Sequence, residues 1–268
     1  MRRTFLLPVI PFLLFSLSMA QVSIVGELSQ DRDARPGDQY QGTILVRNDT
    51  DEPQEAKVYQ TDYLFFSDGT NRYDEPGSHP RSNAQWITFS PAYITLPPHA
   101  TVNVSFSVLI PAASATPLAG TYWSMLMIEG IPKSSPESSR RDAKAEMGIM
   151  QSIRYGIQIA THIAGTGSRM IEFENPRVVA REKGGKVFQI DVKNIADLGM
   201  RPEVYLELFN EQGVSLGKYV GIRYRIYPGT SVRQSIDLSS VPKGSYKALV
   251  VVDAGGEDVF GAQYTLQL

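Results

Sequence analysis

The sequence lacks cysteine altogether, so the chain cannot form a disulfide and offers no thiol nucleophile. Histidine is scarce as well, with three residues in 268. None of His79, His99 and His162 has a second histidine or a carboxylate at the spacing of metal ligands. We therefore predict no metal site and no cofactor. No set of residues indicates a catalytic site either, and we predict that the protein is not an enzyme.

A surplus of positive charge is also missing. The chain has 26 Lys and Arg residues against 28 Asp and Glu residues, and without Arg2 and Arg3 its net charge is −4. This balance argues against nucleic acid and against an anionic membrane surface as binding partners.

Long apolar runs are absent after the first one, Phe5–Leu17, which lies between Arg2-Arg3 and Ser18-Met19-Ala20. A basic start, an apolar centre and small residues at the end are typical of a secretory signal peptide, so we predict that residues 1–20 are cleaved. A membrane anchor is the alternative, but the run is shorter than the about 20 residues that span a bilayer. We predict no stable membrane span elsewhere. An exported protein without disulfides suits the bacterial periplasm, with the cell surface as the alternative location.

No long amphipathic helix is evident, whereas strand patterns are frequent. In the stretch 84–132, apolar and polar residues alternate over Thr101–Val108, which predicts a strand with one buried and one solvated face. Tyr122–Ile128 is apolar at nearly every position, which is typical of a strand in the middle of a core. This stretch predicts the centre of an antiparallel sandwich.

The remaining strand patterns divide into two groups separated by the small, flexible residues 164–168. The first group also contains a polar loop, residues 67–83, and a second polar segment, residues 132–141. Its predicted strands are Val22–Leu28, Tyr40–Arg47, Ala56–Phe66 and Met147–Ile163. The second group is predicted to contain Val187–Asn194, Val204–Phe209, Ile222–Tyr227, Val232–Leu238, Tyr246–Val252 and Val259–Leu266.

Regular short strands with turn residues between them predict an all-β protein with two tandem immunoglobulin-like β-sandwich domains. We place the domains at residues 21–165 and 169–268. The two halves also share landmarks in the same order, which predicts two copies of one fold. The matched pairs are Val46-Arg47-Asn48 with Val192-Lys193-Asn194, PPHATVNVSF with YPGTSVRQSI, and Ala119–Tyr122 with Lys243–Tyr246.

The predicted strand Met147–Ile163 stands out because its apolar alternation extends back toward the polar segment before it. An ordinary core strand explains Ile153–Ile163. The upstream part contains Glu146, Gly148 and Gln151, which fit burial less well. An exposed, alternating edge can accept a strand from another chain.

The order of short motifs in residues 22–163 resembles the first domain of the PapD-like periplasmic pilus-assembly chaperones. The motifs are, in order, Val46-Arg47-Asn48, Phe89-Ser90-Pro91, Leu96-Pro97-Pro98, Tyr122-Trp123 and Glu129-Gly130-Ile131-Pro132. A polar loop and a long strand follow them.

The resemblance implies that the long strand is lent to a pilin-like subunit to complete its fold. It implies that Arg32 and Arg154 hold the terminal carboxylate of the subunit, for which an arginine fork is well suited. Ala145, Met147 and Ile149 would be the side chains lent to the subunit. Arg32 lies in the charged run DRDAR, where a solvated side chain is the alternative, and Arg154 could equally be a surface residue.

The second half is more similar to the second domain of WxL-interacting surface proteins. Together these features predict a periplasmic chaperone or assembly factor that binds exported surface or fimbrial subunits by strand addition, with an outer-membrane usher as a further partner. The alternative is a structural or adhesive surface module that has no free sheet edge.

Overall fold

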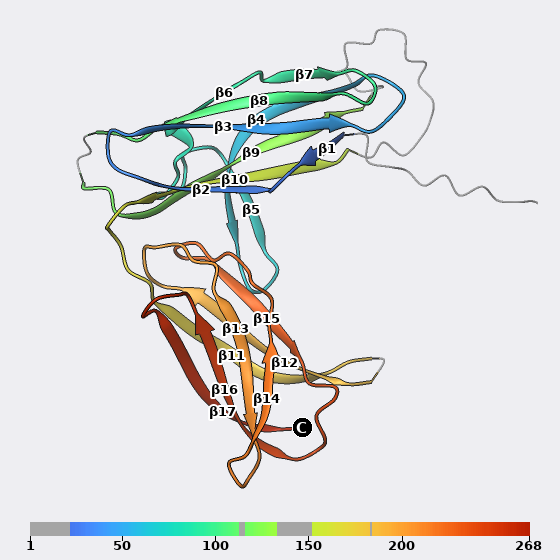
Figure 1. Cartoon of the computed structure of the whole chain (residues 1–268), viewed down its shortest axis with the longest axis vertical. Helices are drawn as coiled ribbons and strands as arrows, with labels where there is room; N and C mark the ends of the chain where they lie inside the picture. The colour runs from blue at the N-terminus through green and yellow to red at the C-terminus, as the bar shows by residue number, and fades with distance from the viewer. Residues whose placement is uncertain (1–21, 113–115, 133–151, 183) are drawn as a thin grey trace, which may run out of the picture.

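The computed structural model describes residues 22–112, 116–132, 152–182 and 184–268 (Figure 1). The predicted signal peptide, residues 1–20, lies outside these residues. The described chain is almost entirely β-structure, and its strands form two sandwiches that lie end to end, which confirms the predicted fold class. No helix among the described residues is long and apolar enough to cross a membrane.

The first sandwich contains strands β1 to β10. One sheet has the strand order β1 (Val22–Val25), β3 (Gln39–Asn48), β8 (Thr101–Leu109) and β6 (Ile87–Ser90). The other has the order β2 (Ser29–Ala34), β10 (Arg154–Ile163), β9 (Gly120–Ile131), β4 (Gln54–Phe65) and β5 (Asn71–Asp74), with β7 (Tyr93–Leu96) paired to β4.

The first predicted strand, Val22–Leu28, is wrong as a single element. The chain bends at Gly26, where φ is +107°, a conformation that glycine adopts without steric cost. The residues before the bend form β1, antiparallel to β3, and the residues after it form β2, parallel to β10 in the opposite sheet. The first strand thus moves from one sheet to the other.

The predicted loop 67–83 contains a further strand, β5. It forms a hairpin with the long strand β4 and extends toward the second sandwich (Figure 1). The hairpin touches that sandwich, because the backbone N–H of Ser67 donates a hydrogen bond of 3.0 Å to Ser231 Oγ.

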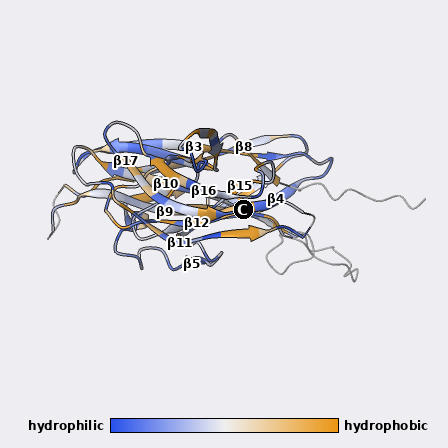
Figure 2. Ribbon diagram, turned by 90° about the horizontal axis from the view of Figure 1, so that it is seen from below, coloured by the Kyte–Doolittle hydropathy of each residue, from blue (hydrophilic) through white to orange (hydrophobic). Residues whose placement is uncertain are grey.

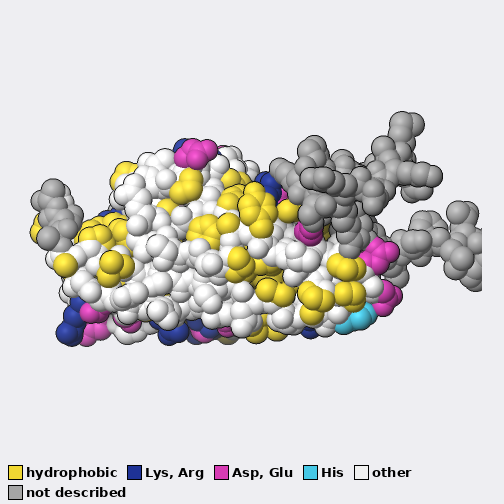
Figure 3. Space-filling model, turned by 90° about the horizontal axis from the view of Figure 1, so that it is seen from above, with side chains coloured by type: hydrophobic (Ala, Val, Ile, Leu, Met, Phe, Trp, Pro, Cys, Tyr) yellow, Lys and Arg dark blue, Asp and Glu magenta, His cyan; other side chains and the backbone are white. Residues whose placement is uncertain are grey.

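The core of the first sandwich lies between its two sheets and follows the predicted alternation. Val104 and Val108 on β8, Leu126 and Ile128 on β9, and Ile157 on β10 are fully buried. Hydrophobic residues fall within the strands, while the connecting loops are mostly hydrophilic (Figure 2). On the face turned away from the second sandwich, hydrophobic side chains form several groups, and charged side chains lie mainly toward the margins of the view (Figure 3).

In the second sandwich, the described residues form seven strands. One sheet has the order β11 (Ile171–Ala180), β12 (Lys186–Asn194) and β15 (Ser231–Asp237). The other has the order β14 (Ser215–Val220), β13 (Glu203–Phe209), β16 (Ser245–Asp253) and β17 (Val259–Gln267).

The predicted strand Ile222–Tyr227 is wrong. Only an isolated bridge between Ile226 and Met200 occurs there. Ile226 and Tyr227 are nevertheless almost completely buried, since the segment inserts these side chains into the core and the domain junction. Their apolar character therefore reflects burial of a loop, which a sequence pattern cannot distinguish from a short strand.

The two sandwiches repeat one another in hydrogen-bonding detail. Asn48, at the end of β3, is fully buried, and its amide donates to the carbonyls of Leu96 and Pro97. Asn194, at the end of β12, is also fully buried and donates to the carbonyls of Leu198 and Ile226. Each asparagine thus ties the end of its strand to neighbouring segments of its own sandwich.

Candidate functional site

Strand β10 has one covered and one uncovered part. It pairs with β9 along its whole length, from Arg154 to Ile163. On its other side, β2 pairs only with Gln158–Ile163, beginning where the N–H of Gln158 donates a 3.0 Å hydrogen bond to the carbonyl of Leu28. No described strand pairs with the other side of Arg154–Ile157. We call these four residues the open edge.

The pairing register shows which backbone groups the open edge presents. The N–H of Gly130 on β9 donates to the carbonyl of Ile153, so the backbone groups of residues at odd positions face β9. Those at even positions face away, as the bond of Gln158 to Leu28 shows. The N–H and C=O groups of Arg154 and Gly156 therefore point outward from the sheet edge, where another strand can pair with them.

A hollow of about 430 Å³ lies beside the open edge, on the outer face of the sheet. Gly156 makes room for it: a Cβ atom at this position would lie 2.1 Å from Met125 Sδ. The rings of Tyr63 and Tyr73 stand 5.1 Å apart at its wall. The lining residues are Leu28, Tyr63, Tyr73, Met125, Met127, Arg154, Gly156 and Gln158.

The hollow has a mixed lining, in which apolar side chains stand beside a larger share of polar surface. Met125 and Met127 form part of its lining and are each 4% exposed, while Tyr73 and Leu28 at the rim remain 57% and 47% exposed. Methionine is flexible and polarisable, so a surface of this kind can adapt to differently shaped apolar groups. Exposed aromatic and aliphatic side chains beside unpaired backbone are typical of a peptide-binding surface.

Charged groups surround the start of the open edge. Tyr59 donates a 2.8 Å hydrogen bond to Glu129, and Lys57 lies 3.9 Å from the same carboxylate. Arg154 is exposed, and the contact with the Tyr59 hydroxyl raises the pKa of its guanidinium. Burial raises the pKa of Tyr59. The edge thus begins with a permanently charged guanidinium whose field is partly offset by Glu129.

The structure does not bring Arg32 and Arg154 together. Arg32 lies on β2 opposite Thr161, seven positions along β10 from Arg154, which corresponds to about 23 Å at the rise of a strand. Their side chains also leave opposite faces of the sheet, since positions 154 and 161 differ in parity. The predicted pair therefore cannot hold one carboxylate. Ala145, Met147 and Ile149 lie outside the described residues.

The outer face of β2 carries a residue that no sequence motif singles out, Asp31. Its carboxylate accepts a charge-assisted hydrogen bond from Arg225 of the second sandwich and lies 3.9 Å from Nε2 of His162. The alternation of DRDAR already places Asp31 and Arg32 on opposite faces. The pairing of Asp31 with Arg225 has no sequence signal, because the two residues are far apart in the chain.

A buried junction next to this ion pair joins the two sandwiches. Trp123 stacks on Tyr227 with ring centroids 4.6 Å apart, and the Tyr227 hydroxyl donates a 3.0 Å hydrogen bond to Gln158 on β10. Burial raises the pKa of Tyr227, so the phenol stays neutral. The junction therefore contacts β10 at Gln158, the first residue of β10 that β2 covers.

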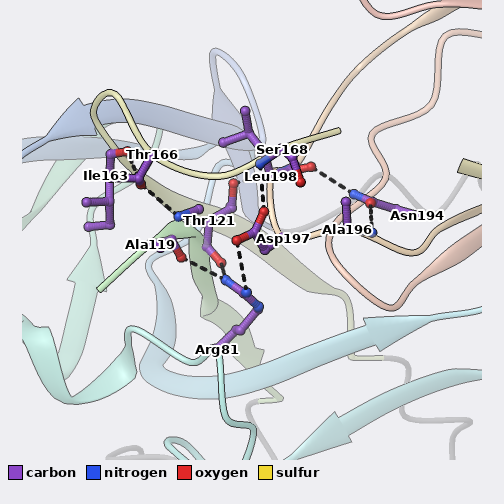
Figure 4. Close-up of polar contacts among 12 residues, drawn as sticks. Arg81, Ala119, Thr121, Ile163, Thr166, Ser168, Asn194, Ala196, Asp197 and Leu198 are labelled. Atoms are coloured by element: carbon purple, nitrogen blue, oxygen red, sulfur yellow. Dashed lines mark hydrogen bonds and ion pairs between the residues drawn. The ribbon is translucent and has the colours of Figure 1, made fainter. Parts of the chain in front are cut away.

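A cluster of polar contacts beside the linker, residues 164–168, also joins the two sandwiches (Figure 4). Arg81 donates to the carbonyls of Ala119 and Thr121, and its guanidinium lies 3.8 Å from the carboxylate of Asp197. Asp197 also accepts a 2.7 Å hydrogen bond from the N–H of Ser168 in the linker. The second sandwich is thus attached to the first through the linker, a loop and the aromatic stack.

No protein-family model and no curated protein sequence matches this chain. Among solved structures, it is similar to the E. coli chaperone DraB, with 15% identity, a TM-score of 0.42, and coverage of 92% of this chain and 98% of that one. It is also similar to a chain of the CsuC–CsuE chaperone–tip subunit complex of Acinetobacter baumannii, with 11% identity, a TM-score of 0.46, and coverage of 89% and 97%.

A further similar structure is a chain from the complex of the Salmonella enterica SafA pilin with the SafB chaperone. Its identity is 15%, its TM-score is 0.41, and the match covers 94% of this chain and 99% of that one. Fimbrial chaperones are thus among the structures that this chain resembles, in agreement with the resemblance predicted from the motifs. At TM-scores below 0.5, the likeness by itself assigns no function to this chain. The predicted likeness of the second half to WxL-interacting proteins stays a prediction.

Proposed function

We propose that this protein is a chaperone or assembly factor for exported protein subunits, and that it binds them by strand addition at the open edge of β10. The observation that carries this proposal is the half-covered strand β10. Arg154 and Gly156 direct backbone groups outward, where no strand among the described residues pairs with them, while Gln158–Ile163 pair on both sides. Main-chain hydrogen bonds along such an edge supply affinity for any extended segment.

The hollow beside the edge supplies selectivity. An extended segment paired with β10 places alternate side chains on the outer face of the sheet, next to Met125 and Met127. An apolar side chain there is buried against methionine and tyrosine, which stabilises the complex by about 25 cal/mol per Å² of apolar surface removed from water. The client is therefore a segment with hydrophobic residues at alternate positions, the pattern of an unpaired strand.

Arg154 is the one cation of the predicted pair that lies at the open edge. In this proposal it attracts a carboxylate of the client, while Arg32 has no part in binding. Ala145, Met147 and Ile149, which lie outside the described residues, are the side chains lent to the client in this proposal. The protein acts in the periplasm after removal of residues 1–20, and an outer-membrane usher is a further partner. A purely adhesive module fits less well, because such a module would not leave the edge unpaired.

The test uses tagged protein isolated from the periplasm of its native host, with copurified subunits identified and quantified. Arg154→Pro removes one outward N–H while leaving the β9 pairing intact, because that N–H faces away from β9. Arg154→Ala removes only the side chain and serves as the matched control. We expect Arg154→Pro to lower subunit recovery at least about tenfold, the effect of about 1.4 kcal/mol, and Arg154→Ala to lower it less. Equal recovery with wild type and Arg154→Pro would contradict strand addition here.

A further inference from the structure

Gln158 lies at one end of the hollow beside the open edge. Its pairing partner on β9 is Met125, while Gly156, the next residue on the same face of β10, is paired with Met127. Arg154 lies at the other end of the hollow, four positions along the strand. The hollow is therefore bounded along β10 by two polar side chains, with the space over Gly156 between them and methionine in its lining.

The second sandwich fixes the orientation of the Gln158 amide. The Tyr227 side chain is almost completely buried, and its hydroxyl donates a 3.0 Å hydrogen bond to Gln158 Oε1. If the amide were turned, N–H groups would face Tyr227, and the buried hydroxyl proton would have no acceptor among the described residues. Oε1 therefore faces Tyr227, and Nε2 faces away from it.

The Nε2 group of Gln158 keeps two N–H donors. No group among the described residues accepts a hydrogen bond from it. Within the same part of the chain, Nε of Arg169 is the one enclosed side-chain nitrogen or oxygen without a partner, so Nε2 of Gln158 is accessible. Since Gln158 lines the hollow and Tyr227 does not, the two N–H groups are open to the hollow. The polar part of the lining thus includes a donor that awaits an acceptor.

A strand added at the open edge would place one side chain in the hollow. The client residue opposite Gly156 lies on the same face of the sheet as Gly156, because directly paired residues point to the same side. Gln158 is then its diagonal neighbour at about 7–8 Å, a distance that long side chains can bridge. Glutamine and glutamate fit this position, because each has a methylene stem that can cover the methionines and a terminal oxygen that accepts a hydrogen bond.

We propose that Gln158 is a specificity-determining residue of the client site. Its Nε2 group donates to the terminal oxygen of a glutamine or glutamate side chain opposite Gly156, and Tyr227 is the residue that positions the amide. This inference rests on the proposed strand addition at the open edge, and it adds one polar position to the otherwise apolar pattern of the client. A site with a hydrogen-bond donor at a fixed point discriminates against a residue that lacks the acceptor.

The test uses the full chain without residues 1–20 and three capped peptides, acetyl-Ser-Val-Thr-Val-Xaa-Val-Thr-Val-Ser-amide, in which Xaa is glutamine, glutamate or methionine. The caps remove the terminal charges, and methionine has nearly the length of glutamine but no oxygen. Fluorescence anisotropy of dye-labelled peptides gives the dissociation constants. Wild type is expected to bind the glutamine and glutamate peptides about fivefold more tightly than the methionine peptide, which is the size of one hydrogen bond.

Gln158→Glu separates client binding from a structural role. Its carboxylate still accepts the hydrogen bond of Tyr227 but has no donor, so the glutamate peptide should bind at least about tenfold more weakly than the glutamine peptide. If Gln158 only supported Tyr227, this variant would keep the preferences of wild type. Tyr227→Phe keeps the ring stack and frees the amide to turn, so the preference for an oxygen should fall at least about twofold.

Two outcomes would overturn the inference alone. One is a methionine peptide that binds wild type as tightly as the other two, a comparison that needs no variant. The other is a folded Gln158→Glu variant with the preferences of wild type. Arg154→Pro should weaken all three peptides at least about tenfold. Binding that Arg154→Pro leaves unchanged, or no binding of any peptide to wild type, would contradict strand addition at the open edge and the inference with it.

Discussion

The indole of Trp123 stacks on the phenol of Tyr227, with ring planes inclined by only 12°. The first residue belongs to β9 and the second to the second sandwich, and both are almost completely buried. The Tyr227 hydroxyl reaches Gln158, where β2 begins to cover β10. The second sandwich therefore contacts β10 at the residue that directly follows the open edge, Arg154–Ile157.

Truncating the stack should destabilise the protein strongly. Trp123→Ala removes a large buried side chain and is expected to lower the free energy of unfolding by about 3–5 kcal/mol. Tyr227→Phe keeps the stack and removes one hydrogen bond, for an expected loss of about 1 kcal/mol. Urea unfolding followed by circular dichroism gives both values. Equal effects of the two substitutions would show that the ring contact contributes little.

Gly156 and Met125 should be energetically coupled. Gly156→Ala places a Cβ against Met125 Sδ, so the methionine must move, and we expect a loss of about 1–3 kcal/mol. In a Met125→Ala background the added methyl group meets free space, so the same substitution should cost clearly less. A double-mutant cycle of unfolding free energies measures this coupling. Strictly additive effects would contradict the close approach in the structure.

The stability should fall on mild acidification because of His162. Burial lowers the pKa of His162 below 6.5, and a nearby Asp31 only partly opposes the effect. The unfolded chain thus binds a proton more readily than the folded one, so stability is lost as pH falls below 6.5, by at most about 1.4 kcal/mol per pH unit. Burial lowers the pKa of His79 in the same way.

The corresponding measurement is the urea midpoint of wild type and His162→Gln between about pH 5 and about pH 8. Below pH 6.5, the urea midpoint of His162→Gln should fall less steeply with pH than that of wild type. The double variant His162→Gln/His79→Gln should show a still weaker dependence on pH. Identical slopes in wild type and the variants would rule out these two histidines as the origin of the pH dependence.

Asn48 and Asn194 should contribute similar amounts to the stability of the sandwiches in which they lie. Each is fully buried and makes several hydrogen bonds through its side chain. Asn48→Ala and Asn194→Ala are each expected to cost about 3 kcal/mol, because backbone carbonyls lose their partners in the interior. Hydrogen exchange resolved by segment should show loss of protection mainly in the sandwich that carries the substitution. A uniform loss in both sandwiches would indicate that they unfold as one unit.

Regular alternation made β8 predictable, and a run of apolar residues indicated β9. The repeat was visible because Asn48 and Asn194 sit in matching positions. Strands β2 and β5 were missed, because both are short, charged and paired at the margin of a sheet, where propensity is weak. The predictions also omitted β6, β7, β11 and β14.

The site was harder to predict than the strands. Strand β10 falls within the predicted strand Met147–Ile163. Arg32 nevertheless lies opposite Thr161, about 23 Å along the sheet from Arg154 and on its other face, so the two arginines do not meet. The hollow depends on Gly156, whose role becomes visible only with Met125 beside it. The contact between Asp31 and Arg225 depends on how two sandwiches meet, which local patterns do not encode.

Amide hydrogen exchange of the free protein, resolved at single residues by NMR, tests the open edge most directly. The N–H groups of Arg154 and Gly156 should exchange rapidly, whereas those of Tyr155, Ile157 and Gln158 should be protected by β9 or by Leu28. Protection of Arg154 and Gly156 equal to that of Tyr155 and Ile157 would mean that the chain already covers its own edge, and the proposed mode of binding would be contradicted.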